Sequence, residues 1–429
     1  MPSQARIAAT AFLKKSVAAM PELTPADPAA LGEELSPADA GLALAVVRTV
    51  HQRWLTLELL LRSVGCPPLS NLSHGVQAVV LGSAAQLLFF DRLPARAVVH
   101  DAVELARRLG GEKSSGFVNA VLRSLDEAVM AAPAAAGEPW TPGADRLPVD
   151  LRGGEVLTSR PLWGDLLPDP ANPVRHLAAA CGLPRPLVRA MVDAHGAEAA
   201  AGVAAAGVRR PPVFVAEGTS PPARYDGAPA WLPAYLAENP ARRVQDPASA
   251  LAVASTAGLE PGTILDLCAG RGTKTRQLIA THPDAEVFAW DPDAERTLDL
   301  RKIPGVEVGE PTPDARFDLV LLDVPCTNTG VLARRTEARY RWTPERLASL
   351  VALQREILER GAGLVAPGGH LLYSTCSLDP AENREQVAWL RGQAFGAGFE
   401  PVHEHLRLPG GVGDAYTDGS YHALLRRGG

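Results

Sequence analysis

Two cysteines occupy similar places in the sequence, each directly after an apolar run. Cys326 follows LLDVP and Cys376 follows LLYST. A thiolate is a strong nucleophile, and its reactivity depends on lowering the thiol pKa from about 8.5. A lone cysteine at a strand end is usually a small core residue. Two of them after two strands of one sheet instead predict a shared site for covalent catalysis, in which a sulfur adds to a substrate and later leaves.

A glycine-containing loop is the second candidate site. The stretch DLCAGRG (266–272) joins a predicted strand to a predicted helix, and its glycines allow the backbone to approach a ligand closely. Asp291, Glu310 and Asp323 follow the next strands. Such acids suit a ligand rich in hydroxyl and amino groups, because a carboxylate can accept both ribose hydroxyls. The chain has no phosphate-binding G-x-x-x-x-G-K-[ST] motif. Its D-x-x-x-G-x-G spacing favours S-adenosylmethionine over NAD.

Alternating strands and helices must position these residues from about Val244 onward. The apolar runs predict strands at 263–270, 286–291, 306–310, 317–326, 370–376 and 420–427, and the periodicity predicts helices at 273–282, 295–303 and 344–365. This alternation predicts a parallel, doubly wound sheet. Ligands of such sheets bind beyond the carboxyl ends of the strands, where both candidate sites lie.

The N-terminal part has a different pattern. Residues 1–17 predict a helix without a signal-peptide segment, and residues 37–128 predict at least four packed helices. Residues 131–150 are rich in Ala, Pro and Gly and predict a loosely ordered linker. Val213–Val215 predicts a short strand. Composition alone does not assign the helical part any chemistry.

Composition excludes several classes of protein. The net charge of −6 excludes a globally basic nucleic-acid coat, so any attraction to phosphate must come from a local patch. The five cysteines are odd in number and lack C-x-x-C spacing, which argues against a disulfide framework and against a zinc site. No apolar run approaches the roughly 20 residues that span a membrane. We therefore expect a cytoplasmic protein with reduced thiols, no metal and no membrane contact.

A methyl donor beside a thiol suggests one reaction in particular. Carbon 5 of a pyrimidine is too poor a nucleophile to take a methyl group directly. A thiolate that adds to carbon 6 makes carbon 5 enamine-like and so divides one difficult step into two easier ones. A base must then remove the proton on carbon 5 before the thiol can leave.

The motifs around both cysteines resemble the RNA (cytosine-5) methyltransferases. DVPCTNTGVLARRTEARYRW (323–342) and STCSLDPAENREQV (374–387) match the Pro-Cys and Thr-Cys elements of that family, and residues 243–275 are similar to its entry segment and first cofactor loop. Residues 86–123 resemble a NusB-like RNA-binding domain. The combination is typical of the Sun/Fmu-type small-subunit ribosomal RNA methyltransferases. The resemblance covers about 37–128 and 240–427.

This resemblance implies an α/β Rossmann-like S-adenosylmethionine methyltransferase domain preceded by an all-α NusB-like domain. We expect a helical RNA-binding domain at 1–135, a linker with a small connecting subdomain at 136–240, and the methyltransferase domain at 241–429. The implied reaction methylates carbon 5 of a cytosine in RNA, foremost small-subunit ribosomal RNA, through a covalent cysteine–cytosine intermediate in a monomer. Transfer RNA as substrate, or an RNA-binding assembly factor with an inactive methyltransferase domain, remain alternatives.

The resemblance also implies roles for individual residues. Cys376 is the nucleophile, and Cys326 assists release of the product. Lys274 lies near the Pro-Cys element, where its charge favours a thiolate, and Asp323 holds the amino edge of the cytosine, the cofactor or both. The implied cofactor contacts are Cys268, Ala269, Gly270, Arg271, Gly272, Thr273, Lys274, Asp291, Glu310 and Asp323.

Three departures from the family pattern are visible. The family loop A-P-G-G-K-T reads G-R-G-T-K-T (270–275), with Arg271 in place of proline. Glu310 stands where the family has Asp. The aromatic residues that follow Asp-Gly in the family are replaced in Asp-Gly-Ser-Tyr-His (418–422).

A cluster of basic and aromatic residues after Cys326 predicts a groove for single-stranded RNA. Its members are Arg334, Arg335, Arg339, Arg341, Tyr340 and Trp342. The alternative is a solvated loop with Trp342 packed inward. A second set of basic residues lies in the helical part: Arg107, Arg108, Lys113 and Arg123.

Overall fold

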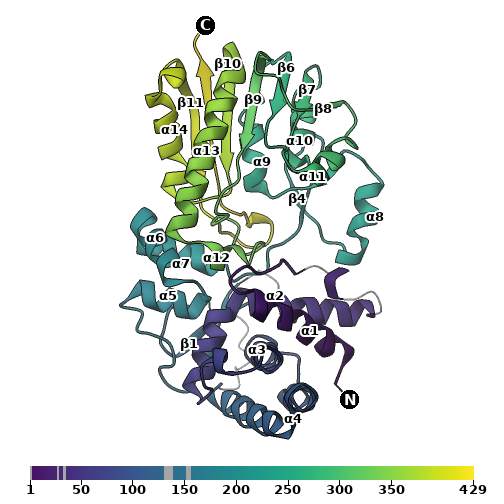
Figure 1. Cartoon of the computed structure of the whole chain (residues 1–429), viewed down its shortest axis with the longest axis vertical. Helices are drawn as coiled ribbons and strands as arrows, with labels where there is room; N and C mark the ends of the chain where they lie inside the picture. The colour runs from purple at the N-terminus through teal and green to yellow at the C-terminus, as the bar shows by residue number, and fades with distance from the viewer. Residues whose placement is uncertain (1, 27–28, 32–34, 130–138, 151–155) are drawn as a thin grey trace. The chain divides into compact units, whose positions relative to one another are not determined.

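A computed structural model describes the chain in five stretches: 2–26, 29–31, 35–129, 139–150 and 156–429. The chain divides into two compact units, each described here by itself (Figure 1). The helical unit comprises 1–211 together with 332–341, and the sheet unit comprises 212–331 together with 342–429. The segment that follows Cys326 therefore leaves the sheet unit after Val331 and returns to it at Trp342.

Four long helices form the main part of the helical unit: α1 (Gln4–Ala19), α2 (Pro37–Ser63), α3 (His74–Phe89) and α4 (Ala95–Ala128). Ser3, Ser36 and Ser73 begin the first three, each accepting a hydrogen bond from a backbone N–H three residues further on. Almost all of α3 is buried, because α1, α2 and α4 pack around it. The prediction of packed helices over 37–128 is confirmed.

The remainder of the helical unit is more ordered than the sequence predicted. Residues 131–138 of the predicted linker lie outside the described residues, but β1 (Arg146–Val149) pairs antiparallel with β2 (Thr158–Pro161). Leu147 and Val149 are buried, so a loosely ordered linker is wrong for this stretch. Three helices follow: α5 (Pro173–Cys181), α6 (Arg185–His195) and α7 (Ala197–Ala206). The contact boundary between the units falls at 211/212, inside the predicted 136–240 connection.

The predicted RNA groove after Cys326 is wrong for three of its six members. Arg339, Tyr340 and Trp342 are buried, and the first two pack inside the helical unit. The Arg339 guanidinium, in the short helix α12 (Ala338–Arg341), donates to five backbone carbonyls: those of Gln52, Cys181, Gly207, Leu332 and Thr336. The Tyr340 hydroxyl donates to the carbonyl of His51 at 2.6 Å. The Cys181 carbonyl lies at the end of α5 (Pro173–Cys181), where a helix leaves its last carbonyls without an intrahelical donor. Arg339 supplies a donor there.

A seven-stranded sheet forms the centre of the sheet unit, in the order β11-β12-β10-β9-β6-β7-β8. Its strands are β6 (Thr263–Asp266), β7 (Glu286–Ala289), β8 (Val306–Val308), β9 (Phe317–Asp323), β10 (Val365–Thr375), β11 (Phe399–Arg407) and β12 (Ser420–Arg427). β12 runs antiparallel to both neighbours, and the other neighbouring pairs are parallel. The predicted parallel, doubly wound sheet is confirmed; the edge strand β11 was not predicted. Chain order reverses between β6 and β9, which is where ligands of such sheets bind.

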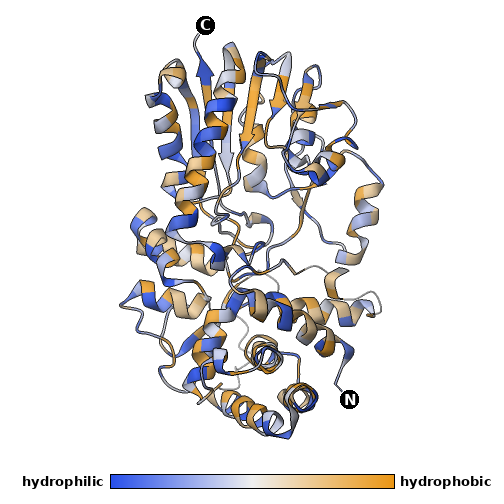
Figure 2. Ribbon diagram, in the orientation of Figure 1, coloured by the Kyte–Doolittle hydropathy of each residue, from blue (hydrophilic) through white to orange (hydrophobic). Residues whose placement is uncertain are grey.

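Helices cover both faces of this sheet, and alternate strand residues point to opposite faces. Val320 and Leu322 of β9 belong to the core with α13 (Pro344–Leu364) and α14 (Arg384–Gly392). Leu319 and Leu321 belong to the core with α9 (Pro247–Ala254) and α10 (Thr273–Thr281). Figure 2 shows the resulting hydrophobic inner strands. The continuous apolar run of β9 is thus explained by burial on both faces.

Shorter elements complete the sheet unit. A three-stranded sheet precedes the large one, with β3 (Phe214–Glu217) between β4 (Ala223–Arg224) and β5 (Arg242–Val244), and with α8 (Leu232–Ala237) beside it in sequence. The predicted strand at Val213–Val215 is therefore confirmed, displaced by one or two residues. The helix α11 (Ala294–Leu300) lies between β7 and β8 in sequence. Within the described ranges, no helix has the length and apolar character needed to cross a membrane.

We predict that Arg339→Ala lowers the free energy of unfolding of the helical unit by on the order of 3 kcal/mol, because several buried carbonyls lose their donor. Arg339→Lys should lose part of this, since an ammonium group lacks the planar fork of donors. Urea unfolding followed by the helix signal measures the effect. Arg335→Ala, at an exposed position of the same segment, is the matched control. Equal stability of the Arg339→Ala and Arg335→Ala variants would contradict this account.

Candidate active site

The pairing of two neighbouring strands brings the two cysteines together. β9 and β10 run parallel with Asp323 opposite Ser374, so both chains leave the sheet at the same edge. Cys326 follows β9 by three residues and Cys376 follows β10 directly. Their sulfur atoms lie 3.3 Å apart, within hydrogen-bonding distance. The expectation that the two sulfurs lie together at one edge of the sheet is confirmed.

Asn328 contacts both cysteines and was missed by the sequence analysis. Its Nδ2 donates to the carbonyl of Cys326 at 2.8 Å, and its Oδ1 accepts from Cys376 Sγ at 3.2 Å. Its φ of 60° lies in the left-handed region, which Asn tolerates better than most residues. The sequence shows an Asn two residues after Cys326, but Asn is common in turns. Only the folded loop determines that its side chain points toward the two cysteines.

Gly330 is the point at which three loops meet. Its N–H donates to the carbonyl of Cys376 at 2.9 Å, and its carbonyl accepts from the Gly419 N–H at 2.8 Å. A Cβ atom at Gly330 would lie 2.6 Å from the Gly419 oxygen and 2.7 Å from the Cys376 oxygen. Only glycine permits this approach, which links the loops after β9 and β10 to the start of β12.

The two sulfurs differ in environment. Cys326 is buried, whereas Cys376 is partly exposed. The hydrogen bond with Cys376 and burial together raise the pKa of Cys326 well above its ordinary value. Burial and the neighbouring sulfur thus favour the protonated form of the Cys326 thiol. Cys376 is the more accessible of the two sulfurs.

A charged pair lies beside the sulfurs. Lys274, in the first turn of α10, places Nζ 2.7 Å from Asp323 Oδ2, and Ser374 Oγ donates to Asp323 Oδ1 at 2.6 Å. Burial opposes the charge of Lys274, but the attraction of Asp323 outweighs it and, with a smaller contribution from Cys376, raises the pKa of the ammonium group. Lys274 thus stays cationic beside Asp323.

The glycine-containing loop lies at the carboxyl end of β6. Asp266 is fully buried; its Oδ2 accepts from Thr275 Oγ1 at 2.7 Å, and its Oδ1 has no hydrogen-bond partner among the described residues. Burial raises the pKa of Asp266 to about 7. Burial and the charge of Asp266 also raise the pKa of Cys268, so this third thiol is not poised as a nucleophile.

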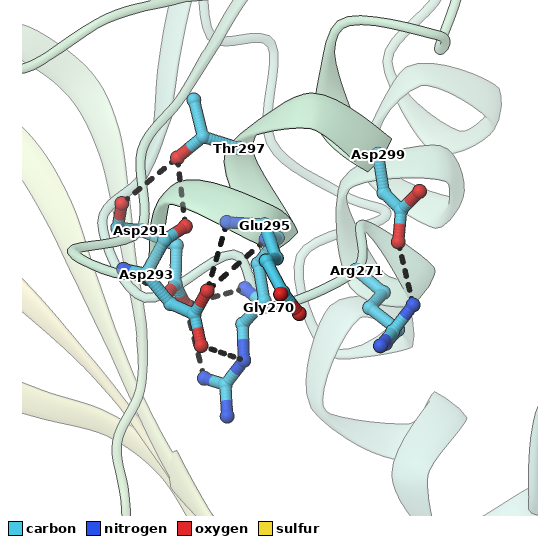
Figure 3. A network of polar contacts seen from close by, with 8 residues as sticks. Gly270, Arg271, Asp291, Asp293, Glu295, Thr297 and Asp299 are labelled. Carbon is cyan, nitrogen blue, oxygen red and sulfur yellow. Dashed lines mark hydrogen bonds and ion pairs between the residues drawn. The ribbon is translucent and has the colours of Figure 1, made fainter.

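Asp291 ties this loop to the end of β7 (Figure 3). Its Oδ2 accepts from the Gly270 N–H at 2.9 Å, and its Oδ1 accepts from the Asp293 N–H at 3.0 Å. Arg296 Nη1 also donates to Oδ2 at 3.5 Å. Oδ1 keeps a lone pair for a further donor, because each carboxylate oxygen has about two acceptor sites. Thr297 Oγ1 donates to the Asp291 carbonyl at 3.0 Å and fixes the turn into α11.

Two departures from the family pattern have a local explanation. The Arg271 side chain is exposed and pairs with Asp299 at 2.6 Å, directed toward α11 (Figure 3). Arginine can therefore replace proline without filling the loop. Glu310 is exposed and pairs with Arg360 at 2.9 Å, and Arg360 stacks over the Trp290 ring with 4.5 Å to its centroid. Glu310 is thus engaged by α13.

The loop residues fit a nucleoside-type cofactor with an amino group. The unpartnered Oδ1 of Asp266 and the spare lone pair of Asp291 Oδ1 can accept from amino and hydroxyl groups. Gly270 has φ of 56°, and a Cβ there would meet nothing within 4 Å, so the backbone is open on that side. A metal site has no such support: among the described residues, no group of three or more His, Cys, Asp or Glu side chains could hold an ion.

Comparison with known proteins decides the family. Residues 256–394 match the model of the 16S rRNA methyltransferase RsmB/F family, and residues 3–127 match the NusB family. A probable ribosomal RNA small subunit methyltransferase B of Synechocystis sp. is 30% identical, over 82% of this chain and 81% of the relative. A putative methyltransferase of Mycobacterium tuberculosis is 35% identical, over 70% of this chain and 67% of its own length.

The chain belongs to the RsmB/F family. It is an S-adenosylmethionine-dependent RNA methyltransferase with an N-terminal NusB domain, as the sequence resemblance implied. Ribosomal RNA small subunit methyltransferase B of Vibrio cholerae is 29% identical over 98% of this chain and 97% of its own. The crystal structure of PH0851 shares the fold, with a TM-score of 0.64 over 98% of each chain at 18% identity. The Rossmann-like fold of this RsmB/F-family enzyme is therefore confirmed.

We predict that Asp266→Asn stabilises the sheet unit in a pH-dependent way. Because the folded-state pKa lies above the ordinary 3.8, the wild type loses stability as pH rises from about 4 to about 7. A tenfold change in the protonation equilibrium corresponds to about 1.4 kcal/mol, so the full effect above pH 7 is on the order of a few kcal/mol. Urea unfolding at a series of pH values measures it. A difference between variant and wild type that is the same at pH 5 and pH 8 would contradict the prediction.

Proposed function

We propose that this enzyme transfers a methyl group from S-adenosylmethionine to carbon 5 of a cytosine in small-subunit ribosomal RNA, through a covalent cysteine–cytosine intermediate. The observation that carries the proposal is the sulfur pair, in which the buried Cys326 and the more exposed Cys376 lie 3.3 Å apart. Two neighbouring sulfurs suit a reaction in which one sulfur adds to the cytosine and the other assists release of the methylated product.

The proposed covalent step uses Cys376 as the nucleophile. Its thiolate adds to carbon 6 of the cytosine, the carbon 5–carbon 6 double bond is consumed, and carbon 5 becomes nucleophilic. Cys326 and Lys274 stabilise the thiolate before attack, one by a hydrogen bond and the other by charge. After methylation of carbon 5, a base accepts the proton on that carbon, and the electron pair of the carbon–hydrogen bond re-forms the carbon 5–carbon 6 double bond. The bond from carbon 6 to Cys376 breaks at the same time, and its electron pair returns to the sulfur as a thiolate. Cys326 assists this release.

Asp323 and Lys274 are proposed to hold the target base. Asp323 accepts from Lys274 and Ser374 and retains acceptor capacity for the amino edge of a cytosine. The base must reach this edge of the sheet out of its stack, as in other enzymes that act on nucleobases. RNA loops present such unstacked bases.

The cofactor is proposed to lie along the loop Cys268–Lys274. S-adenosylmethionine supplies the methyl group when bound. Asp291 is proposed to accept from the ribose hydroxyls, and Asp266 lies beneath the loop. Glu310 and Asp323 complete the proposed set, Glu310 after release from Arg360. These assignments rest on the open Gly270 backbone and on the lone pairs that remain on the carboxylates.

Small-subunit ribosomal RNA is the proposed substrate because relatives that align with nearly the whole chain are named for it. Transfer RNA and an inactive assembly factor remain the alternatives. The presence of both cysteines with Lys274 and Asp323 in one contact network favours an active enzyme. Bisulfite sequencing of ribosomal and transfer RNA from cells with and without the gene decides among them, since a cytosine protected only in the presence of the gene identifies the substrate.

The cysteine roles predict opposite outcomes for two variants. Cys376→Ala should abolish methylation and give no covalent RNA adduct, because the attacking sulfur is missing. Cys326→Ala should accumulate a protein–RNA adduct, because release fails. Denaturing gel electrophoresis with radiolabelled RNA distinguishes the two. The reverse pattern would exchange the assigned roles, and Cys66→Ala serves as a control because Cys66 lies in the helical unit.

The proposed ribose contact predicts weaker cofactor binding in Asp291→Ala, by on the order of 1–3 kcal/mol, since hydroxyl donors and the Gly270 N–H lose their acceptor. Asp291→Asn, which retains one acceptor oxygen, should lose less. Titration calorimetry with S-adenosylmethionine measures both. Unchanged affinity in Asp291→Ala would place the ribose contact elsewhere.

A further inference from the structure

A fully buried carboxylate lies behind the cysteine pair and has no role in the mechanism above. Glu382 is 0% exposed and ends the short turn Pro380–Glu382, six residues after Cys376. A buried carboxylate is costly unless its oxygens are hydrogen-bonded. Its partners therefore indicate what the fold gains by keeping it.

The partners of Glu382 are on the loop that carries Cys326. Its Oε1 accepts from the Thr327 N–H at 2.9 Å and from Gln354 Nε2 at 2.9 Å, and its Oε2 accepts from the Thr327 hydroxyl. Thr327 is the residue directly after Cys326. Gln354, on α13, also donates to the carbonyl of Pro325 at 2.9 Å, so the backbone is held on both sides of the cysteine.

The same network reaches the loop that carries Cys376. Ser377 Oγ lies 3.1 Å from Thr327 Oγ1 and 3.2 Å from Thr329 Oγ1. The Tyr373 hydroxyl, on β10, donates to the Glu382 carbonyl at 2.6 Å. The neighbours of both cysteines thus belong to one network: the Glu382 carboxylate holds Thr327, and Thr327 contacts Ser377, the residue after Cys376.

Charge adds a second effect. After the hydrogen bond to Cys376, burial and the charge of Cys376, the negative charge of Glu382 further raises the pKa of Cys326. The titratable groups that act on Cys326 are Cys376, Glu382 and Tyr373. Burial raises the pKa of Glu382 itself, although its hydrogen bonds oppose this. The carboxylate of Glu382 therefore favours the protonated form of Cys326.

We propose that Glu382 is a positioning residue that joins the loops of Cys326 and Cys376 and keeps Cys326 as the proton-bearing member of the sulfur pair. It touches neither substrate nor cofactor and acts through Thr327 and through its charge. The expected effect on catalysis rests on the proposed function. The effect of Glu382 on the protonation of Cys326 can be measured without RNA.

The test is Glu382→Gln, which keeps the size of the side chain and removes its charge. Initial rates of alkylation by iodoacetamide are measured at each cysteine, by peptide mass spectrometry, over a series of pH values. We expect the midpoint of the Cys326 profile to fall by about one pH unit in the variant. We also expect kcat for RNA methylation to fall about tenfold or more, because the sulfurs lose their alignment. KM for S-adenosylmethionine should stay within about twofold of wild type, because the loop at Asp291 is untouched.

Glu337→Gln, at a buried glutamate of the helical unit, is the matched control and should leave both alkylation profiles unchanged. If Glu382→Gln does not fold, Thr327→Val tests the same connection: it should lower kcat, and Thr327→Ser, which keeps the hydroxyl, should restore it. An unchanged Cys326 profile in Glu382→Gln, or a wild-type kcat in Thr327→Val, overturns the proposal. If the wild-type enzyme methylates no RNA but Glu382→Gln shows the expected shift of the Cys326 profile, only the proposed function is contradicted.

Discussion

The parallel pairing of β9 with β10 is the constraint on which the rest of the site depends. With Asp323 directly opposite Ser374, the two strands end at the same level, and the residues beyond them have no sheet partner of their own. Both loops must then satisfy their backbone groups locally, and they do so with each other: Gly330 with Cys376, and Thr327 with Glu382. These hydrogen bonds between the two loops bring the two sulfurs together.

The loops around the sulfurs use residues with unusual backbone or burial properties. Asn328 adopts a left-handed conformation, and Glu382 is a carboxylate without solvent contact. Two carbonyl oxygens approach Gly330 so closely that a Cβ atom there would collide with them. Each is unfavourable alone. Together they hold two thiols within hydrogen-bonding distance, and a preorganised pair needs little rearrangement when a base arrives. The sheet and the helices around the site stabilise these locally unfavourable conformations.

The chain passes from the sheet unit into the helical unit shortly after Cys326. Residues 332–341 are held in the helical unit by Arg339 and Tyr340. The loop of Cys326 is therefore fixed at one end by β9 and continues at the other into a segment of the NusB-bearing unit. Basic and aromatic residues that resemble an RNA-binding surface in the sequence act here as internal donors to backbone carbonyls.

Six of the seven strands of the large sheet, all except β11, could be predicted from the sequence, because burial on one or two faces leaves a clear apolar period. The sequence also placed Cys326, Cys376, Asp291 and Asp323 at strand ends, since chain order in a parallel sheet brings those ends to one edge. Tertiary structure alone decided which polar side chains turn inward. Arg339 and Glu382 look like surface residues in the sequence, and Asn328 like an ordinary turn residue. Their partners lie far along the chain or depend on a single backbone angle, and hydrophobic periodicity carries no information about either.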